Sequence, residues 1–218
     1  MIPNKNQLEQ CIREHSDEGF FATFLFRKIS IRITKYVAMT ELTPNQITFF
    51  SFLLVLISII FLFTGHLITA GILYFLSYVF DNVDGEIARL KNKQSNSGFL
   101  FDSTLDRVKE GIIFFALMIY TGYWITGFIA FFSIYMTNMV VESIGKRDKF
   151  TLGEVHANIF NKTKFKRSFL TSGIDMQVMI ISGGLILNQI LLSLIYFIVI
   201  QNIYWIAIFI LVFRGWKK

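Results

Sequence analysis

The chain has 218 residues, of which 54% are hydrophobic and only 17% are charged, whereas a soluble domain usually carries about 25% charged residues. This composition, with 25 Phe and two Pro, excludes a disordered chain and argues against a soluble enzyme. The single Cys excludes a disulfide framework, and the net charge of +6 is expected to set membrane topology and meet anionic lipid rather than nucleic acid.

The N-terminal segment 1–41 precedes the apolar part of the chain. Between Asp17 and Thr40 it mixes Phe and Leu with Arg and Lys, a pattern that predicts an amphipathic helix lying on the cytosolic leaflet. A soluble cap on the helical bundle is the alternative interpretation. We therefore divide the chain into a cytosolic N-terminal segment, 1–41, and a membrane domain, 42–218.

Three long stretches of the chain contain no charged residue. They are Leu42–Phe80 with 39 residues, Gly111–Val141 with 31 and Met176–Phe213 with 38. Because a membrane-spanning helix needs about 20 residues, each stretch predicts two spans joined by a turn. The turns are expected at Gly65-His66, Thr121-Gly122-Tyr123 and Asn188-Gln189. The sequence thus predicts an all-α polytopic membrane protein with six transmembrane helices.

The positions of the basic residues predict the orientation of these helices. All 21 Lys and Arg residues lie outside the three expected turns, so the positive-inside rule places both termini and the basic loops in the cytosol. The motif Thr43-Pro44-Asn45-Gln46 is a capping-box pattern and predicts the start of the first span. Because that span begins past residue 40, a cleaved signal peptide is not expected.

The second and third spans reach membrane-spanning length only if they include charged residues. The apolar part of the second span, Leu67–Phe80, has 14 residues, so its helix must continue through Arg89. For the same reason the third helix must begin near Gly98 or Asp102. We expect the two helices to form an antiparallel hairpin whose acidic ends meet at the cytosolic interface.

The spacing of the acids gathers four carboxylates at that interface. Asp81 and Asp84 share one helix face with the small residues Gly85 and Ala88, and Asp102 and Asp106 share a face of the next helix. Four carboxylates in partly dehydrated surroundings need cations. Two divalent ions would balance them, and oxygen ligands suit Mg²⁺, with Mn²⁺ as the alternative. The other interpretation pairs the acids with Arg89, Arg107 and Lys109, which leaves the small residues unexplained.

The full pattern is Asp81-x2-Asp84-Gly85-x2-Ala88-Arg89-x8-Gly98-x3-Asp102-x3-Asp106. It resembles, position by position, the signature of the CDP-alcohol phosphotransferase family. The resemblance implies an enzyme that displaces CMP from a CDP-linked alcohol with the hydroxyl of a second alcohol. It also implies a homodimer with a cytosol-facing site that holds two metal ions.

The resemblance further implies roles for single residues. Asp81, Asp84 and Asp102 are similar to ligands of the first metal, and Asp81, Asp102 and Asp106 to ligands of the second. Asp106 also resembles the general base. Positions that resemble contacts of the CDP donor, or close packing beside it, are Thr43, Asn45, Gly85, Ala88, Arg89, Ser95 and Gly98. In the basic loop 143–170, Lys166 and Arg167 are candidates for binding a phosphate of the acceptor, although a solvated positive-inside loop is the simpler explanation.

Shorter motifs bear on the substrates. The stretches Leu42–Gln46 and Gly85–Lys91 resemble the inositol-phosphate branch, in particular the membrane domain of di-myo-inositol phosphate phosphate synthases, and imply an inositol-phosphate type acceptor. The stretch Ser172–Met176 lacks the extra Arg of that branch, which argues against a phosphorylated acceptor. A CDP-diacylglycerol, CDP-archaeol or CDP-choline-like donor is a further alternative. A divalent-cation transporter is the alternative class, but its path would carry polar groups across the whole membrane, whereas the four acids lie at one edge.

Overall fold

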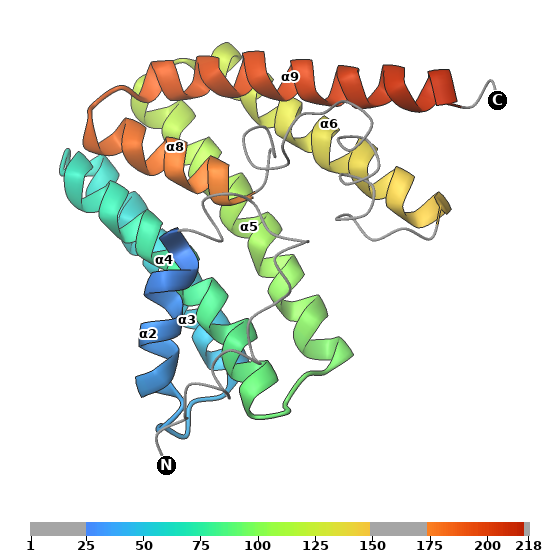
Figure 1. Ribbon diagram of the computed structural model, residues 1–218. Helices are drawn as coiled ribbons and strands as arrows, with labels where there is room; N and C mark the ends of the chain where they lie inside the picture. Colours follow the sequence, from blue (N-terminus) through green and yellow to red (C-terminus); the bar gives the residue numbers. More distant parts are fainter. Residues whose placement is uncertain (1–24, 149–173, 216–218) are drawn as a thin grey trace.

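The computed structural model of the chain describes residues 25–148 and 174–215 (Figure 1). Every regular element in these ranges is helical, which confirms the predicted all-α class for the described residues. The helices are α2 (Arg27–Val37), α3 (Pro44–Phe63), α4 (Leu67–Leu90), α5 (Asn96–Thr121), α6 (Trp124–Asp148), α8 (Ile174–Ile186) and α9 (Ile190–Gly215).

Two of the described helices combine the length and the apolar composition that crossing a membrane requires. They are Pro44–Phe63, which is α3, and Ile190–Ala207 within α9, while Trp124–Val140 and Ile174–Ile186 are shorter apolar segments. Helices α4 and α5 are longer than α3 but carry charged residues in one half. The six predicted spans thus correspond to six helices, of which two meet this criterion on their own.

The helix ends follow the capping signals of the sequence. Thr43 Oγ1 accepts a hydrogen bond from the backbone N–H of Gln46 at 3.4 Å, and the Gln46 side chain accepts one from the N–H of Thr43 at 2.9 Å. This reciprocal pair is the predicted capping box, and α3 begins at Pro44 directly after it.

All three predicted turns separate helices at the expected residues. Gly65 and Gly122 have φ values of +80° and +73°, and Asn188 has φ of 54°. The left-handed conformation ends a helix at little cost when the residue is Gly or Asn. The helix pairs α3–α4, α5–α6 and α8–α9 therefore reverse direction where the sequence predicts.

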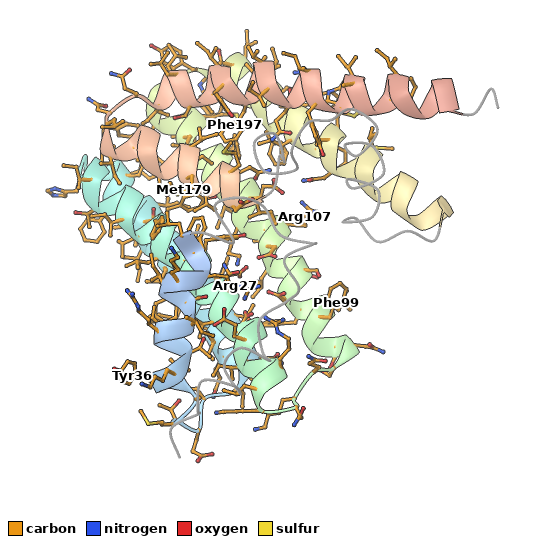
Figure 2. The ribbon with its side chains drawn as sticks, viewed as in Figure 1. Arg27, Tyr36, Phe99, Arg107, Met179 and Phe197 are labelled. Atoms are coloured by element: carbon orange, nitrogen blue, oxygen red, sulfur yellow. The ribbon has the colours of Figure 1, made fainter. Side chains whose placement is uncertain are left out.

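The predicted amphipathic helix corresponds to α2, but its most buried side chains are polar. The buried residues of α2 are Arg27, Ser30 and Thr34, and α2 packs against α4. Figure 2 shows Arg27 at the contact between these two helices. Ile29, Ile33 and Val37 of α2 also pack against the buried core, so α2 covers the bundle with both hydrogen-bonding and apolar side chains.

Helices α4 and α5 belong to different parts of the bundle although only Lys91–Ser95 separates them. Helix α4 packs against α2, α3 and α8, whereas α5 packs against α3, α6 and α9. Within the described residues the backbones of α4 and α5 do not pack closely on each other, and the two helices diverge (Figure 1). The predicted hairpin is therefore open, and long polar side chains bridge its two arms.

The N-terminal part of α4, at the opposite end from its acidic residues, packs tightly against α8. A Cβ atom on Gly71 would lie 2.7 Å from the backbone oxygen of Ser182, so only Gly permits this approach. Buried apolar side chains such as Ala70, Phe114, Leu185 and Phe197 fill the surrounding core. This packing fixes α4 and α8 against each other and brings the first turns of α8 beside the polar half of the hairpin.

Candidate active site

Three of the four signature acids meet between α4 and α5. Asp81 lies on α4, Asp102 and Asp106 lie on α5, and one carboxylate oxygen from each falls within 4.8 Å of the others. All three are half-buried. The predicted convergence of these three acids is thus present in the structure.

Lys109, one of the three basic residues that the alternative interpretation pairs with the acids, lies among them. The Lys109 ammonium is buried, contacts Asp81 Oδ1 and lies 2.7 Å from Asp106 Oδ1. It also donates to Ser51 Oγ at 3.2 Å. Pairing of the acids with a basic residue is therefore real for Lys109. Arg107, by contrast, pairs with Glu110 at 3.0 Å.

The charge balance of this group suits a divalent cation. Three ionised carboxylates against one ammonium leave two negative charges, which one divalent ion would neutralise. Carboxylate oxygens are the ligands that Mg²⁺ and Mn²⁺ prefer. The donor set, its charge and its half-buried position therefore fit the metal site that the signature implies.

The fourth signature acid is held apart from the other three. Asp84 is buried and accepts a hydrogen bond from Thr48 Oγ1 of α3 at 2.5 Å. The group of three closely spaced acids does not include it. Thr48 and Ser51 support the two acids of α4 from α3, since Ser51 Oγ also lies 3.4 Å from Asp81 Oδ1. Thr48 and Ser51 are three residues apart on a mostly apolar helix, and this polar pair was the sequence feature that could have indicated their contact with the acids.

Several predicted donor-contacting residues gather at the start of α5. Ser95 caps this helix by accepting from the N–H of Gly98 at 3.0 Å. A Cβ atom on Gly98 would lie 3.0 Å from Ser95 Oγ and 3.4 Å from Asn45 Oδ1. The structure therefore brings Asn45, Ser95 and Gly98 together. Thr43 caps its own helix, two residues before Asn45.

On α4, Arg89 folds back over the signature glycine. A Cβ atom at Gly85 would lie 3.3 Å from Arg89 Nη1, so the small residue makes room for the guanidinium. Ala88 is half-buried on the same helix. The remaining predicted contacts, Lys166 and Arg167, lie outside the described residues. Arg89 lies in the last turn of α4, and its guanidinium lies over Gly85, the residue that follows Asp84.

Glu86, a buried residue within the signature segment, has hydrogen-bond partners from α2 and is not part of the three-acid group. Glu86 is fully buried, and three side chains of α2 donate to its carboxylate: Arg27 Nη1 at 2.7 Å, Ser30 Oγ at 2.7 Å and Thr34 Oγ1 at 2.6 Å. The donors repeat at i, i+3 and i+7 of α2, so a polar stripe in that segment was the sequence signal for this contact.

A cavity adjoins the three-acid group and reaches toward α8. Its walls come from four helices, α3, α4, α5 and α8, and include Asp106 and Lys109. Tyr74, Ser77 and Tyr78 of α4, Glu110 of α5 and Gln177 of α8 complete its polar lining. The carboxylate of Asp106 therefore faces a space that water-sized groups can enter.

Comparison with known proteins identifies the family. Residues 41–212 match the model of the CDP-alcohol phosphatidyltransferase family. The chain therefore belongs to that family of enzymes, as the signature predicted.

Individual relatives agree with this assignment. A bifunctional IPC transferase and DIPP synthase of Archaeoglobus fulgidus is 31% identical over 195 residues, which are 89% of this chain and 36% of the relative. A protein of the same name from Thermococcus kodakarensis is 42% identical over 103 residues, 47% of this chain and 23% of the relative. The archaetidylinositol phosphate synthase of Pyrococcus horikoshii is 36% identical over 86 residues, 39% of this chain and 46% of the relative. The chain thus spans less than half the length of these relatives.

Proposed function

We propose that the chain transfers a substituted phosphate group from a CDP-linked alcohol to the hydroxyl of a second alcohol and releases CMP. The observation that carries this proposal is the group formed by Asp81, Asp102 and Asp106 at the spacing of the family signature. A cavity beside Asp106 offers a place for the attacking hydroxyl. This proposal is favoured over a cation transporter because the family is one of enzymes.

The acids are proposed as the metal ligands. Asp81, Asp102 and Asp106 would hold one Mg²⁺ or Mn²⁺, and Asp84 would join Asp81 and Asp102 in holding a second ion, as the resemblance implies. Bound divalent ions neutralise a pyrophosphate and stabilise the departing CMP. Because Asp84 hydrogen-bonds to Thr48, its part in this set requires that the bond be exchanged or shared.

The donor is proposed to lie against the signature faces of α4 and α5. Arg89 would offer two parallel N–H groups to the pyrophosphate, since a guanidinium binds phosphate oxygens as a fork. Gly85 keeps that side chain close to the helix. The cluster of Asn45, Ser95 and Gly98 would contact the CDP portion, with Thr43 and Ala88 shaping the approach.

Asp106 is proposed as the general base. Its carboxylate lines the cavity, and Lys109 holds its Oδ1 at 2.7 Å, which fixes the side-chain orientation. As the acceptor oxygen bonds to the phosphorus, its proton passes to Asp106. The bond between that phosphorus and the CMP oxygen breaks, and CMP leaves with the bonding electron pair. No described nucleophilic side chain forms a covalent intermediate in this scheme.

The leading acceptor is of the inositol-phosphate type. The names of relatives from Thermococcus, Archaeoglobus and Pyrococcus support this choice, because each refers to inositol chemistry or to DIPP synthesis. A lipid-linked donor such as CDP-diacylglycerol or CDP-archaeol is the second candidate, supported by the synthase of Pyrococcus horikoshii and by a phosphatidylinositol phosphate synthase of Corynebacterium glutamicum. A CDP-choline-like donor has no such support.

The proposed setting is the cytosolic face of a lipid bilayer. Six helices, α3 to α6 with α8 and α9, would span it, with both termini and the site on the cytosolic side. We also propose a homodimer, on the family resemblance, and an N-terminal segment, 1–41, at the membrane surface. Labelling of Ser97→Cys from the cytosolic face, after replacement of Cys11, tests the orientation. Labelling only from the other face would reverse it.

The central experiment measures CMP release by the purified chain from a panel of CDP-alcohols. The donors should include CDP-inositol and CDP-diacylglycerol, each with and without myo-inositol phosphate, and mass spectrometry should identify the product. We expect release to require Mg²⁺ or Mn²⁺ and to stop in excess chelator. Full release in excess chelator would contradict the metal site, and no release from any donor would contradict the proposed transfer.

A further inference from the structure

The cavity beside Asp106 contains two buried polar atoms without hydrogen-bond partners among the described residues. They are Oε1 of Glu110 on α5 and Nε2 of Gln177 on α8. Gln177 is 3% exposed, and the Glu110 side chain is 13% exposed. The Gln177 side chain lies beside the Glu110 carboxylate in the cavity lining, but these two atoms do not form a hydrogen bond of normal geometry. Buried polar groups are nearly always satisfied, so this pair indicates that a ligand or water completes it.

The chemistry of this pair selects a hydroxyl group. An amide N–H donates and a carboxylate oxygen accepts, and a hydroxyl can accept from the first while it donates to the second. The other Glu110 oxygen already accepts from Arg107 Nη1 at 3.0 Å, which holds the carboxylate in place. A phosphate would suit this position poorly, because it would place an anion against the Glu110 carboxylate.

The position of the pair relative to Asp106 links it to the reaction. Glu110 follows Asp106 by one helical turn, so both carboxylates lie on one face of α5 and both line the cavity. The cavity volume, counted as the space that the centre of a water molecule can occupy, is about 30 Å³. This volume holds about two water-sized groups. Lys109 is the one cation among the described lining residues, and Asp81 and Asp106 already neutralise it.

We propose that Glu110 and Gln177 bind a second hydroxyl of the acceptor while Asp106 faces the reacting one. This inference rests on the proposed transfer reaction and narrows its acceptor to polyols that carry a hydroxyl near the nucleophilic hydroxyl. An alcohol with a single hydroxyl would leave the pair unsatisfied. A phosphate on the acceptor would lie outside this cavity.

The kinetic test compares myo-inositol phosphate with its monodeoxy analogues as acceptors. Gln177→Leu keeps the size of the side chain but removes the amide, and Glu110→Gln removes the carboxylate charge. We expect each variant to raise the acceptor KM about tenfold, to leave the donor KM unchanged and to lose discrimination against one monodeoxy analogue. The matched control is Gln189→Leu in the exposed α8–α9 turn, which should keep wild-type values. Unchanged acceptor KM in both variants, with CMP release intact, would overturn the inference and leave the proposed reaction standing.

A second measurement does not depend on turnover. Val178 lines the same cavity and is buried, so Val178→Cys in a Cys11→Ser background reports access to the cavity by thiol labelling. Millimolar myo-inositol should slow this labelling severalfold, cyclohexanol should not, and Gln177→Leu should abolish the protection. Equal effects of the two alcohols, or protection that survives Gln177→Leu, would mean that the cavity holds only water. This result decides the inference even if no donor in the panel releases CMP.

Discussion

Two acids on helix α4, five residues apart, differ in how completely the protein satisfies them. Glu86 faces α2, is fully buried and receives three hydrogen bonds from Arg27, Ser30 and Thr34. Asp81 faces α5, is half-buried, and lies among Asp102, Asp106 and the single ammonium of Lys109. The negative charge on the α2 side of α4 is balanced by groups of the protein, whereas the negative charge on the α5 side is not fully balanced.

This difference separates a structural acid from a functional one. A buried carboxylate with a full set of donors fixes the contact between two helices, but it has no remaining capacity for a ligand. A group of carboxylates with too few cations retains negative charge that a metal ion or a substrate must neutralise. Position within the signature does not distinguish a structural acid from a functional one, because Glu86 lies between Gly85 and Arg89. The neighbouring side chains distinguish them.

The largest expected effect is on the α5 side of this comparison. Asp81→Asn or Asp102→Asn keeps the side-chain size but removes a charged metal ligand, so CMP release should fall about 10³-fold or more. Binding of Mn²⁺ to the purified protein, measured by electron paramagnetic resonance, should weaken in parallel. Thermal stability should change little in Asp102→Asn, because the acids repel one another, and should fall more in Asp81→Asn, which also removes one of the two carboxylates that neutralise Lys109. A variant that lost Mn²⁺ binding but kept full turnover would refute the role of the ion.

On the α2 side the effect should be on stability. Glu86→Gln removes the negative charge of the buried Arg27–Glu86 pair, and breaking a buried pair in this way costs about 3–5 kcal/mol. The thermal unfolding midpoint should fall, while turnover per folded molecule stays within a few-fold of the wild type. The matched control is the double variant Arg27→Met, Glu86→Met, which should recover part of the loss. Wild-type stability with lost turnover would place Glu86 in the active site instead.

The contrast also explains what the sequence could and could not predict. Three features follow from signals that act over a few residues. Capping motifs predict the helix starts, Gly or Asn in the left-handed conformation predicts the turns, and residue spacing predicts the meeting of Asp81, Asp102 and Asp106. Most partners of the acids do not follow from such signals. Lys109 is three residues from Asp106 and was a candidate partner in the sequence, but its contact with Asp81 depends on the packing of α5 beside α4. Thr48 and the α2 donors of Glu86 likewise reach the acids through packing between different helices.

The open geometry of the α4–α5 pair has the same origin. A short linker and acidic ends predict a hairpin, but α4 packs on α8 and α5 packs on α6 and α9. The close approach of Gly71 to Ser182 fixes the first of these contacts, and it is set by a residue 111 positions away in the sequence. The cavity lined by Gln177 depends on the same long-range packing, so local sequence patterns did not indicate it.

A smaller effect is expected for Arg89. Arg89→Lys keeps the charge but replaces a planar fork with a single ammonium, so a two-pronged contact with the donor pyrophosphate would be lost. The KM for the CDP-alcohol should rise about tenfold, equivalent to about 1.4 kcal/mol, with stability unchanged. The exposed Lys93 in the α4–α5 linker provides a control through Lys93→Arg, which should have no effect. An unchanged donor KM in Arg89→Lys would assign Arg89 to topology or packing.

The smallest expected effect concerns Thr43, which the family resemblance links to the donor but whose hydroxyl caps α3. Thr43→Ala removes the acceptor for the Gln46 N–H and should cost about 1 kcal/mol of stability, whereas Thr43→Ser preserves the cap and should cost much less. If capping is the whole role of Thr43, the donor KM of both variants should match the wild type. A donor KM that rises several-fold in Thr43→Ala, without a fall in the thermal midpoint, would instead place the hydroxyl against the donor. That outcome would mean that Thr43, like Asp84 beside Thr48, exchanges a hydrogen bond within the protein for one to the substrate. A polar group that is hydrogen-bonded within the free protein could then still become a substrate contact when the donor binds.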